Sequence, residues 1–325
     1  MRVPITTDPD VAMRVLSGGG LAAIPTETVY GLGALADSPS AVARVYAVKG
    51  RPADHPLILH THGADQLGRW ATGAPDFAHR LAQAFWPGPL TLVLMRRPEV
   101  GDHVTGGQDT VALRVPDHPV TLAVLASLDR CVAAPSANRF GRVSPTTAAH
   151  VLQELGSLLD PARDVILDGG PTAVGVESTI VDCTADHPRL LRPGGVTAQQ
   201  IESVTGLSLA AADPAVRAPG TLAAHYAPSA VVRLVPDPGL DQPVRSDPRV
   251  GLIAASELPT PIGVVRLLAP DSVQEYAAGL YGALREADAL GLREVRAVLP
   301  AGPGLAEAVR DRLGRAAAGS GAAHP

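Results

Sequence analysis

The stretch Pro25-Thr-Glu-Thr-Val-Tyr-Gly-Leu-Gly33 constrains this chain more than any other part of its sequence. An apolar run at 21–24 leads into it and predicts a short buried strand. Two threonines and a glutamate follow where that strand should end, and Gly31 and Gly33 predict a turn or a close approach of the backbone to a ligand. Open α/β sheets bind their ligands at the carboxyl ends of strands, so this stretch is a candidate binding loop.

A single lysine stands close behind this loop. Lysine and arginine together number 27, and Lys49 is the only lysine among them. It begins the turn Lys49-Gly-Arg-Pro52, after a predicted helix with Ser38 as its N-cap and Pro39 at its first position. A compact ammonium in a chain that otherwise uses arginine favours a phosphate-binding role for Lys49. We therefore expect Lys49→Ala to lose turnover while its fold stays intact. The alternative is a cation that merely suits the helix dipole.

Length and composition set the broad class. A chain of 325 residues with 46% hydrophobic and 18% charged residues predicts a globular protein of two domains. Its net charge of −5 does not indicate general binding to nucleic acids or membranes. Cys131 and Cys183 lack a CxxC partner, which predicts buried, reduced thiols. Without a signal pattern or an apolar run of about 20 residues, a soluble cytoplasmic protein with no membrane contact is the default expectation.

Short apolar runs and helical spacings alternate through residues 1–209, which predicts an α/β domain with a mixed sheet. We expect helices over 9–17, 39–49, 76–85, 119–128 and 146–155, the last capped by Ser144 or Thr146. We expect strands over 57–60, 90–95, 110–115, 131–134, 165–168, 178–182 and 190–191.

The remainder of the chain divides into a linker and a second domain. Residues 210–229 are rich in proline, yet they contain His225 and Tyr226. Over 230–325 we expect strands at 230–235, 250–254, 262–267 and 295–299 and helices at 272–290 and 304–316, which predicts a small doubly wound parallel sheet. Disorder is expected from Ala317 onwards.

Four polar clusters follow or precede predicted strands. Their hydroxyls, amides and exposed backbone N–H groups suit phosphate or carboxylate oxygens. One such cluster would be ordinary turn chemistry. Four of them, together with Lys49, Arg51 and Arg192, predict a site for a nucleotide or another polyanion. The clusters are Pro25-Thr-Glu-Thr28, Pro135-Ser-Ala-Asn138, Glu177-Ser-Thr179 and Arg192-Pro-Gly-Gly195.

The order and spacing of these motifs resemble the threonylcarbamoyl-AMP synthase family, of YrdC type. The resemblance covers residues 1–209, and the remainder is similar to the longer branch with a Rossmann-like C-terminal domain. The matching motifs are Pro25-Thr-Glu-Thr-Val-Tyr-Gly-Leu, Lys49-Gly-Arg-Pro, Pro56-Leu-Ile-Leu-His60, Pro135-Ser-Ala-Asn138, Ser178-Thr-Ile-Val-Asp182, Ala218-Pro-Gly220 and His225-Tyr-Ala-Pro228.

This resemblance implies a twisted mixed sheet with a concave basic cleft. It also implies a nucleotidyltransferase that converts ATP, L-threonine and bicarbonate to L-threonylcarbamoyl-AMP and pyrophosphate. The product would serve threonylcarbamoyladenosine formation beside the anticodon of tRNA, through a partner transferase. Weak RNA binding would fit such a surface.

The family's site residues carry over to matching positions. The resemblance implies that L-threonine is held by Thr28, His60, Arg114, the backbone at Ala134, and Ser178. It implies that ATP is held by Lys49, Arg51, His55, Thr110, Ser136, Asn138, Ser144, Arg192 and Tyr226, with Lys49 and Arg51 as the catalytic residues. Arg114 would bind the amino-acid carboxylate with two parallel hydrogen bonds; the alternative is a surface ion pair.

Catalysis by positioning and charge neutralisation is the simplest mechanism for this set, with Mg²⁺ carried on the ATP phosphates. Ser136 lacks the GxSxG elbow of a nucleophilic serine. His60 and His62 have no third ligand at metal-binding spacing, so no tightly bound metal is expected.

Two positions depart from the family pattern. His55 stands where asparagine is usual before Pro56, and an imidazole can also donate to a phosphate. The linker has Thr221-Leu-Ala-Ala224 in place of basic residues, which leaves Tyr226 as its main candidate contact. We expect the linker to close over the site and exclude water, the alternative being an ordinary spacer.

Two other functions remain open at this level. A non-catalytic module for double-stranded RNA could use the same basic surface but would not need Thr28, His60, Arg114 and Ser178 together. A carbamoyl-adenylate enzyme of hydrogenase maturation would carry zinc-finger modules, for which two cysteines do not suffice.

Overall fold

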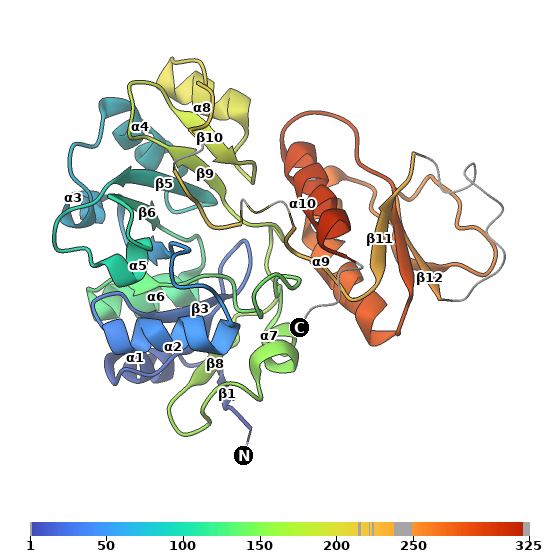
Figure 1. Cartoon of the computed structure of the whole chain (residues 1–325), viewed down its shortest axis with the longest axis horizontal. Helices are drawn as coiled ribbons and strands as arrows, with labels where there is room; N and C mark the ends of the chain where they lie inside the picture. Colours follow the sequence, from blue (N-terminus) through green and yellow to red (C-terminus); the bar gives the residue numbers. More distant parts are fainter. Residues whose placement is uncertain (1, 214–215, 221, 223, 237–248, 321–325) are drawn as a thin grey trace. The chain divides into compact units, whose positions relative to one another are not determined.

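The computed structural model describes residues 2–213, 216–220, 222, 224–236 and 249–320 (Figure 1). The chain forms two compact units. The first unit comprises residues 1–140, 145–173 and 177–221, and the second comprises 141–144, 174–176 and 222–325. Within the described part of the chain, no helix is long and apolar enough to cross a membrane.

The first unit is built on a mixed sheet, as the sequence predicted, and this sheet has ten strands. Its strand order is β1-β8-β2-β3-β7-β4-β6-β5-β9-β10. The strands are β1 Ile5–Thr6, β2 Ala22–Ile24, β3 Gly31–Leu35, β4 Ile58–His60, β5 Leu90–Met95, β6 Thr110–Arg114, β7 Val132–Ala133, β8 Val165–Leu167, β9 Thr179–Asp182 and β10 Arg189–Arg192.

Helices pack on both faces of this sheet (Figure 1). They are α1 Pro9–Ser17, α2 Pro39–Lys49, α3 Leu67–Trp70, α4 Asp76–Phe85, α5 Asp102–Thr105, α6 Pro119–Leu128, α7 Ala148–Leu155 and α8 Ala198–Thr205, with the 3₁₀ turn η1 Ala64–Gln66. One apolar cluster joins α1 and α6 to β2 and β8. A larger cluster joins α2, α4 and α7 to the other face. Within β2, Ala23 belongs to the larger cluster and Ile24 to the smaller, as the two-residue period of a strand requires.

Two local expectations were wrong. The cap of α7 is Thr147, which accepts from the backbone N–H of His150, and not Ser144 or Thr146. Of the two alternatives for Gly31 and Gly33, the turn is wrong, because both residues lie in β3; a close approach to a ligand stays a prediction. A Cβ on Gly33 would come within 2.7 Å of Val132 on neighbouring β7, so glycine allows β3 to lie between close neighbours.

The second unit contains a small parallel sheet, as the sequence predicted. Its order is β11-β14-β12-β13, and all three pairings are parallel. The elements are β11 Val231–Leu234, β12 Val250–Ile253, β13 Val265–Leu268, α9 Val273–Ala289, β14 Glu294–Ala297 and α10 Leu305–Gly319. Because α10 continues to Gly319, the expectation of disorder from Ala317 was wrong for 317–319, and residues 321–325 lie outside the described chain. The predicted domain boundaries at 209 and 230 remain predictions.

Candidate active site

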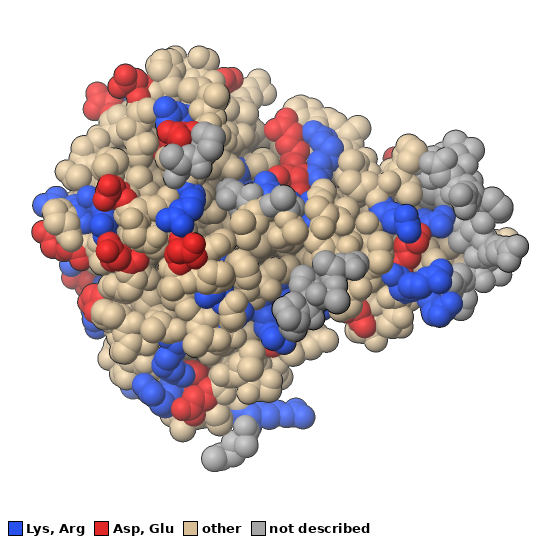
Figure 2. All heavy atoms as spheres, viewed as in Figure 1, with Lys and Arg blue, Asp and Glu red and all other residues tan. Residues whose placement is uncertain are grey.

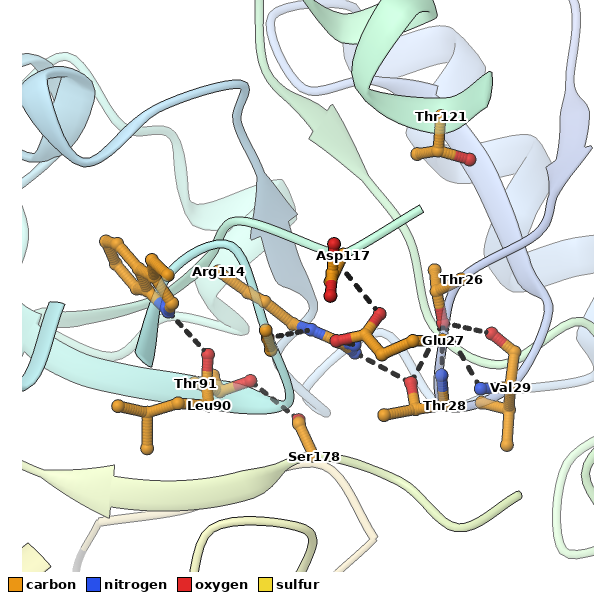
Figure 3. A network of polar contacts seen from close by, with 12 residues as sticks. Thr26, Glu27, Thr28, Val29, Leu90, Thr91, Arg114, Asp117, Thr121 and Ser178 are labelled. Carbon is orange, nitrogen blue, oxygen red and sulfur yellow. Dashed lines mark hydrogen bonds and ion pairs between the residues drawn. The ribbon is translucent and has the colours of Figure 1, made fainter. Parts of the chain in front are cut away.

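A buried arginine occupies the centre of the site. Arg114 is the last residue of β6, and only 4% of its surface is exposed. Its Nη1 donates to the Thr28 hydroxyl at 2.9 Å, its Nη2 lies 2.6 Å from Glu27 Oε1, and its Nε donates to the Gly88 carbonyl at 3.3 Å (Figure 3). The structure therefore brings two predicted threonine-site residues, Arg114 and Thr28, into direct contact.

The loop after β2 holds Thr28 through a compact hydrogen-bonded turn. The Thr26 hydroxyl donates to the Val29 carbonyl at 2.6 Å and accepts from the backbone N–H groups of Thr28 and Val29 at 3.1 and 3.2 Å (Figure 3). The same hydroxyl lies 2.9 Å from the hydroxyl of Thr28. A side-chain hydroxyl that satisfies local backbone groups in this way fixes a turn.

Ser178 lies directly before β9 and is fully buried. Its hydroxyl is 2.7 Å from that of Thr91 on β5 (Figure 3). Arg192 donates from Nη2 to the same hydroxyl at 3.1 Å and from Nε and Nη2 to the Ser178 carbonyl. Its Nη1 donates to the carbonyl of Pro219 at 2.9 Å. Arg192, predicted as an ATP contact, thus holds a predicted threonine contact in this structure.

His60 pairs directly with Arg114 across the neighbouring strands β4 and β6. Burial lowers the pKa of His60 to about 3, and the positive charge of Arg114 adds to this effect. Backbone hydrogen bonds with Ile58 and Val132 oppose the shift only in part. His60 is therefore a neutral imidazole near pH 7 and adds no charge beside Arg114.

This shift predicts a loss of stability in acid. Unfolded His60 binds a proton below about pH 6.5, whereas folded His60 binds one only near pH 3. The unfolded state therefore holds more protons between these values, and the free energy of unfolding falls by up to about 1.4 kcal/mol per pH unit as pH drops. Urea unfolding between pH 6.5 and 4 should show a shallower dependence in His60→Gln than in wild type. His79→Gln, at an exposed position on α4, is the control; equal slopes in all three proteins would contradict the prediction.

A second group of predicted residues surrounds Lys49. Its Nζ donates to the carbonyls of Ser136 and Asn138, and burial, with Arg51, lowers its pKa well below the usual range against the effect of Glu154. This geometry makes Lys49 a support of the loop 135–138, a role that the sequence did not reveal.

Aromatic and cationic side chains lie beside Lys49. Arg51 donates to the Pro56 carbonyl at 3.0 Å, and its guanidinium lies 5.6 Å from the centre of the Phe140 ring. The ring of His55 packs edge-on against Phe140 at 5.3 Å. Burial, with the charge of Arg51, lowers the pKa of His55, so this imidazole is also neutral near pH 7.

Backbone hydrogen bonds connect the two groups. Ala137 donates to the Tyr30 carbonyl at 2.8 Å, and Leu32 donates to the Pro135 carbonyl at 2.8 Å. The loop with Ser136 and Asn138 is therefore fixed to the residues that directly follow Thr28. The two groups, Arg114 with its hydroxyl partner and Lys49 with Arg51, thus form one connected region. Side chains of these types can hold a carboxylate beside a polyphosphate.

The remaining predicted residues lie elsewhere. Thr110 begins β6, four residues before Arg114, and the Ala134 N–H is used by the Ile58 carbonyl at 3.0 Å. Ser144 and Tyr226 belong to the second unit. Tyr226 is buried there with a φ of 62°, and Arg312 lies 5.3 Å from its ring centre. Contacts of these four residues with a ligand remain predictions.

Comparison with known proteins decides the family. Residues 14–194 match the family model described as telomere recombination, which covers Sua5, YciO and YrdC proteins. Residues 196–318 match the model described as threonylcarbamoyl-AMP synthase, C-terminal domain. The chain belongs to the threonylcarbamoyl-AMP synthase family.

Curated members of the family match nearly the whole chain. The threonylcarbamoyl-AMP synthase of Pyrococcus abyssi is 41% identical over 94% of this chain and 93% of its own length. That of Bacillus subtilis is 39% identical over 97% and 94%. A crystal structure of P. abyssi Sua5 complexed with L-threonine superposes with a TM-score of 0.85 at 39% identity, covering 96% of this chain and 94% of that one. The family and fold predicted from the motifs are confirmed.

Sequence reasoning missed three members of the site. Glu27 and Gly88 hold Arg114, and Thr91 touches Ser178. Glu27 lies inside the opening motif and could have been noted as a carboxylate within a buried loop. Thr91 and Gly88 carry no signal in the sequence, because only the folding of β5 beside β6 and β9 brings them there.

Proposed function

We propose that this chain is a threonylcarbamoyl-AMP synthase that forms L-threonylcarbamoyl-AMP and pyrophosphate from ATP, L-threonine and bicarbonate. The observation that carries the proposal is the contact of Arg114 with Thr28, because it offers a carboxylate-binding fork beside a hydroxyl. The structure of P. abyssi Sua5 complexed with L-threonine supports L-threonine as the substrate.

The chemistry needs two bond-forming steps. The threonine amine attacks the carbon of bicarbonate, and loss of water leaves a carbamate. A carbamate oxygen then attacks the α-phosphorus of ATP, and pyrophosphate departs. The chain would contribute by positioning, with Arg114 on the threonine carboxylate and Lys49 and Arg51 near the phosphates.

Mg²⁺ would enter with ATP as part of the substrate, as in other phosphoryl-transfer sites. Within the described part of the chain, no three His, Cys, Asp or Glu side chains gather as a metal site. The product would pass to a transferase that modifies tRNA, in the cytoplasm where tRNA and ATP are available. Free Cys131 and Cys183 fit that location.

Pyrophosphate release tests the function directly. The full-length protein with MgATP and bicarbonate should release pyrophosphate only when L-threonine is added, and mass spectrometry should detect threonylcarbamoyl-AMP. No threonine dependence would overturn the proposal. Retardation of tRNA in a gel without any turnover would favour the RNA-binding alternative.

Residues 216–220 of the predicted linker support a covering role. Ala218 packs with Ile58, Ala112 and Ile180 in a small apolar cluster of the first unit, and the Pro219 carbonyl accepts from Arg192, which also holds Ser178. This segment therefore lies against the threonine side of the site. Whether Tyr226 contacts the nucleotide is a separate part of the proposal.

A charge at Ala218 should release this segment. In Ala218→Glu, a carboxylate would have to lie in the apolar cluster, which is costly unless the segment detaches. We expect pyrophosphate release about tenfold slower, with the Tm of the protein nearly unchanged, because a detached segment no longer excludes water. Unchanged turnover in Ala218→Glu would remove the covering role, and Ala218→Ser is the matched control.

A further inference from the structure

Glu27 carries a buried carboxylate whose function neither the sequence nor the family assignment explains. Its exposed fraction is 7%. One oxygen lies 2.6 Å from Nη2 of Arg114, and the other accepts from the backbone N–H of Asp117 at 3.1 Å (Figure 3). Both partners are donors, and they lie on β6 and just after it. Glu27 therefore connects the loop after β2 to the end of the strand that carries Arg114.

The contacts of Arg114 show what this connection achieves. A guanidinium has five N–H groups. Nε and one N–H of Nη1 donate to the Gly88 carbonyl and the Thr28 hydroxyl, and Nη2 forms an ion pair with Glu27; together these contacts fix the plane of the group. Among the described residues, Nη1 keeps one N–H without a partner, and Nη2, which is buried, makes no hydrogen bond and keeps its N–H groups. Two such groups are what a carboxylate needs to bind with both oxygens.

The chemistry of the side chain is also specific. A carboxylate is acceptor-only and can serve two donors at once, one with each oxygen. A glutamine in the same place has one oxygen and one NH₂ group. Either Arg114 or the Asp117 N–H would then face a donor, so Glu27→Gln keeps the size of the side chain but loses one of the two contacts.

We propose that Glu27 is the positioning residue of the amino-acid carboxylate site, which holds the guanidinium of Arg114 in the plane that receives the carboxylate of L-threonine. Glu27 itself does not touch the substrate. This inference rests on the proposed function and assigns a residue to it. The expected effect is a loss of threonine recognition, with ATP recognition unchanged.

Steady-state pyrophosphate release by the full-length protein is the first test. Glu27→Gln should raise the KM for L-threonine at least tenfold and leave the KM for MgATP within about twofold of wild type. Glu27→Asp is one methylene shorter and cannot reach both donors. It should therefore also raise the KM for L-threonine. If Glu27→Gln is insoluble, the Glu27→Asp variant decides the same question.

Asp164 offers a matched control. Its buried carboxylate also joins an arginine, Arg44 at 2.7 Å, to backbone N–H groups, those of Leu21 at 2.9 Å and Asp160 at 2.8 Å. Leu21 precedes β2, whereas Glu27 follows it. Asp164→Asn should lower the Tm, as any loss of a buried bridge does, but leave the KM for L-threonine unchanged.

A double-mutant cycle separates positioning from general stability. Calorimetry should show that Glu27→Gln weakens threonine binding at least tenfold in the wild type and less than twofold in an Arg114→Ala background, because its effect passes through Arg114. The preference for L-threonine over L-threoninamide, which lacks the carboxylate, should fall in Glu27→Gln.

An unchanged KM for L-threonine in Glu27→Gln, or equal effects in both backgrounds, would overturn this inference. Neither result would affect the proposed function, which fails only if the wild-type protein shows no threonine-dependent pyrophosphate release.

Discussion

Replacing Arg114 by alanine should raise the KM for L-threonine about 100-fold, with less than about a threefold change for MgATP. Two charge-assisted hydrogen bonds to the carboxylate contribute roughly 1.5 kcal/mol or more each, and about 1.4 kcal/mol corresponds to a factor of ten in affinity. The ATP phosphates lie with the Lys49 group on the proposed assignment, which predicts the difference between the two substrates. Calorimetry with each ligand measures it directly.

The partner of Arg114 complicates this variant. Removal of Arg114 leaves Glu27 buried without its ion-pair partner, which costs about 3 kcal/mol or more of stability. Arg44→Ala, which removes the partner of buried Asp164, is therefore the control for lost stability. Arg114→Lys keeps a positive charge beside Glu27 but loses the planar fork, so its KM for L-threonine should rise as well. Equal loss of both ligands in Arg114→Ala would show that Arg114 is structural.

Local signals in the sequence predicted much of the first unit. Asp8 and Ser38 accept at the starts of α1 and α2, each followed by proline, and these boundaries agree with the structure. The helix α8 was overlooked although Thr197 and Gln200 form a capping box that the sequence displays. The capping box is a local feature, so α8 could have been predicted from the sequence alone.

The errors at β3 and within the site have another cause. Gly31 and Gly33 carry the composition of a turn, and only the close neighbours on β2 and β7 explain why a strand has glycine there. In the same way, Thr28 could be predicted from its motif and Arg114 from the family resemblance, but the contact of Glu27 with Arg114 became visible only when the loop after β2 met the end of β6. Contacts between distant segments decide such residues, and a single sequence does not contain those contacts.

Lys49 was predicted to contact phosphate, and the structure gives it a further role in supporting a loop. The sequence favoured a phosphate contact and an intact fold in Lys49→Ala. In the structure the side chain is buried and donates to two carbonyls of the loop 135–138. A protonated amine has three protons, and the contacts found among the described residues use two of them. Support of the loop and a contact to phosphate are therefore compatible, but loss of Lys49 should not be neutral for stability.

Lys49→Met tests both roles, because methionine fills a similar volume without a donor. Each buried carbonyl that loses its donor costs roughly 1–3 kcal/mol, and 1 kcal/mol shifts the Tm of a domain of this size by about 2–4 °C. We therefore expect a Tm lower by about 10 °C, and pyrophosphate release slower by at least about 100-fold through the lost donor to the phosphates. Calorimetry and initial rates measure the two effects separately.

Ser136→Ala is the matched control, since it removes a predicted phosphate contact but keeps the carbonyl that Lys49 binds. Its Tm should stay near that of the wild type while its rate falls. Because Lys49 is the only lysine, reductive methylation of amines reports on it and the α-amino group alone. Burial of Lys49 predicts that it reacts far more slowly in the folded protein than in urea. A native Tm for Lys49→Met, together with rapid methylation of Lys49 in the folded wild-type protein, would contradict the buried arrangement and leave only the phosphate contact.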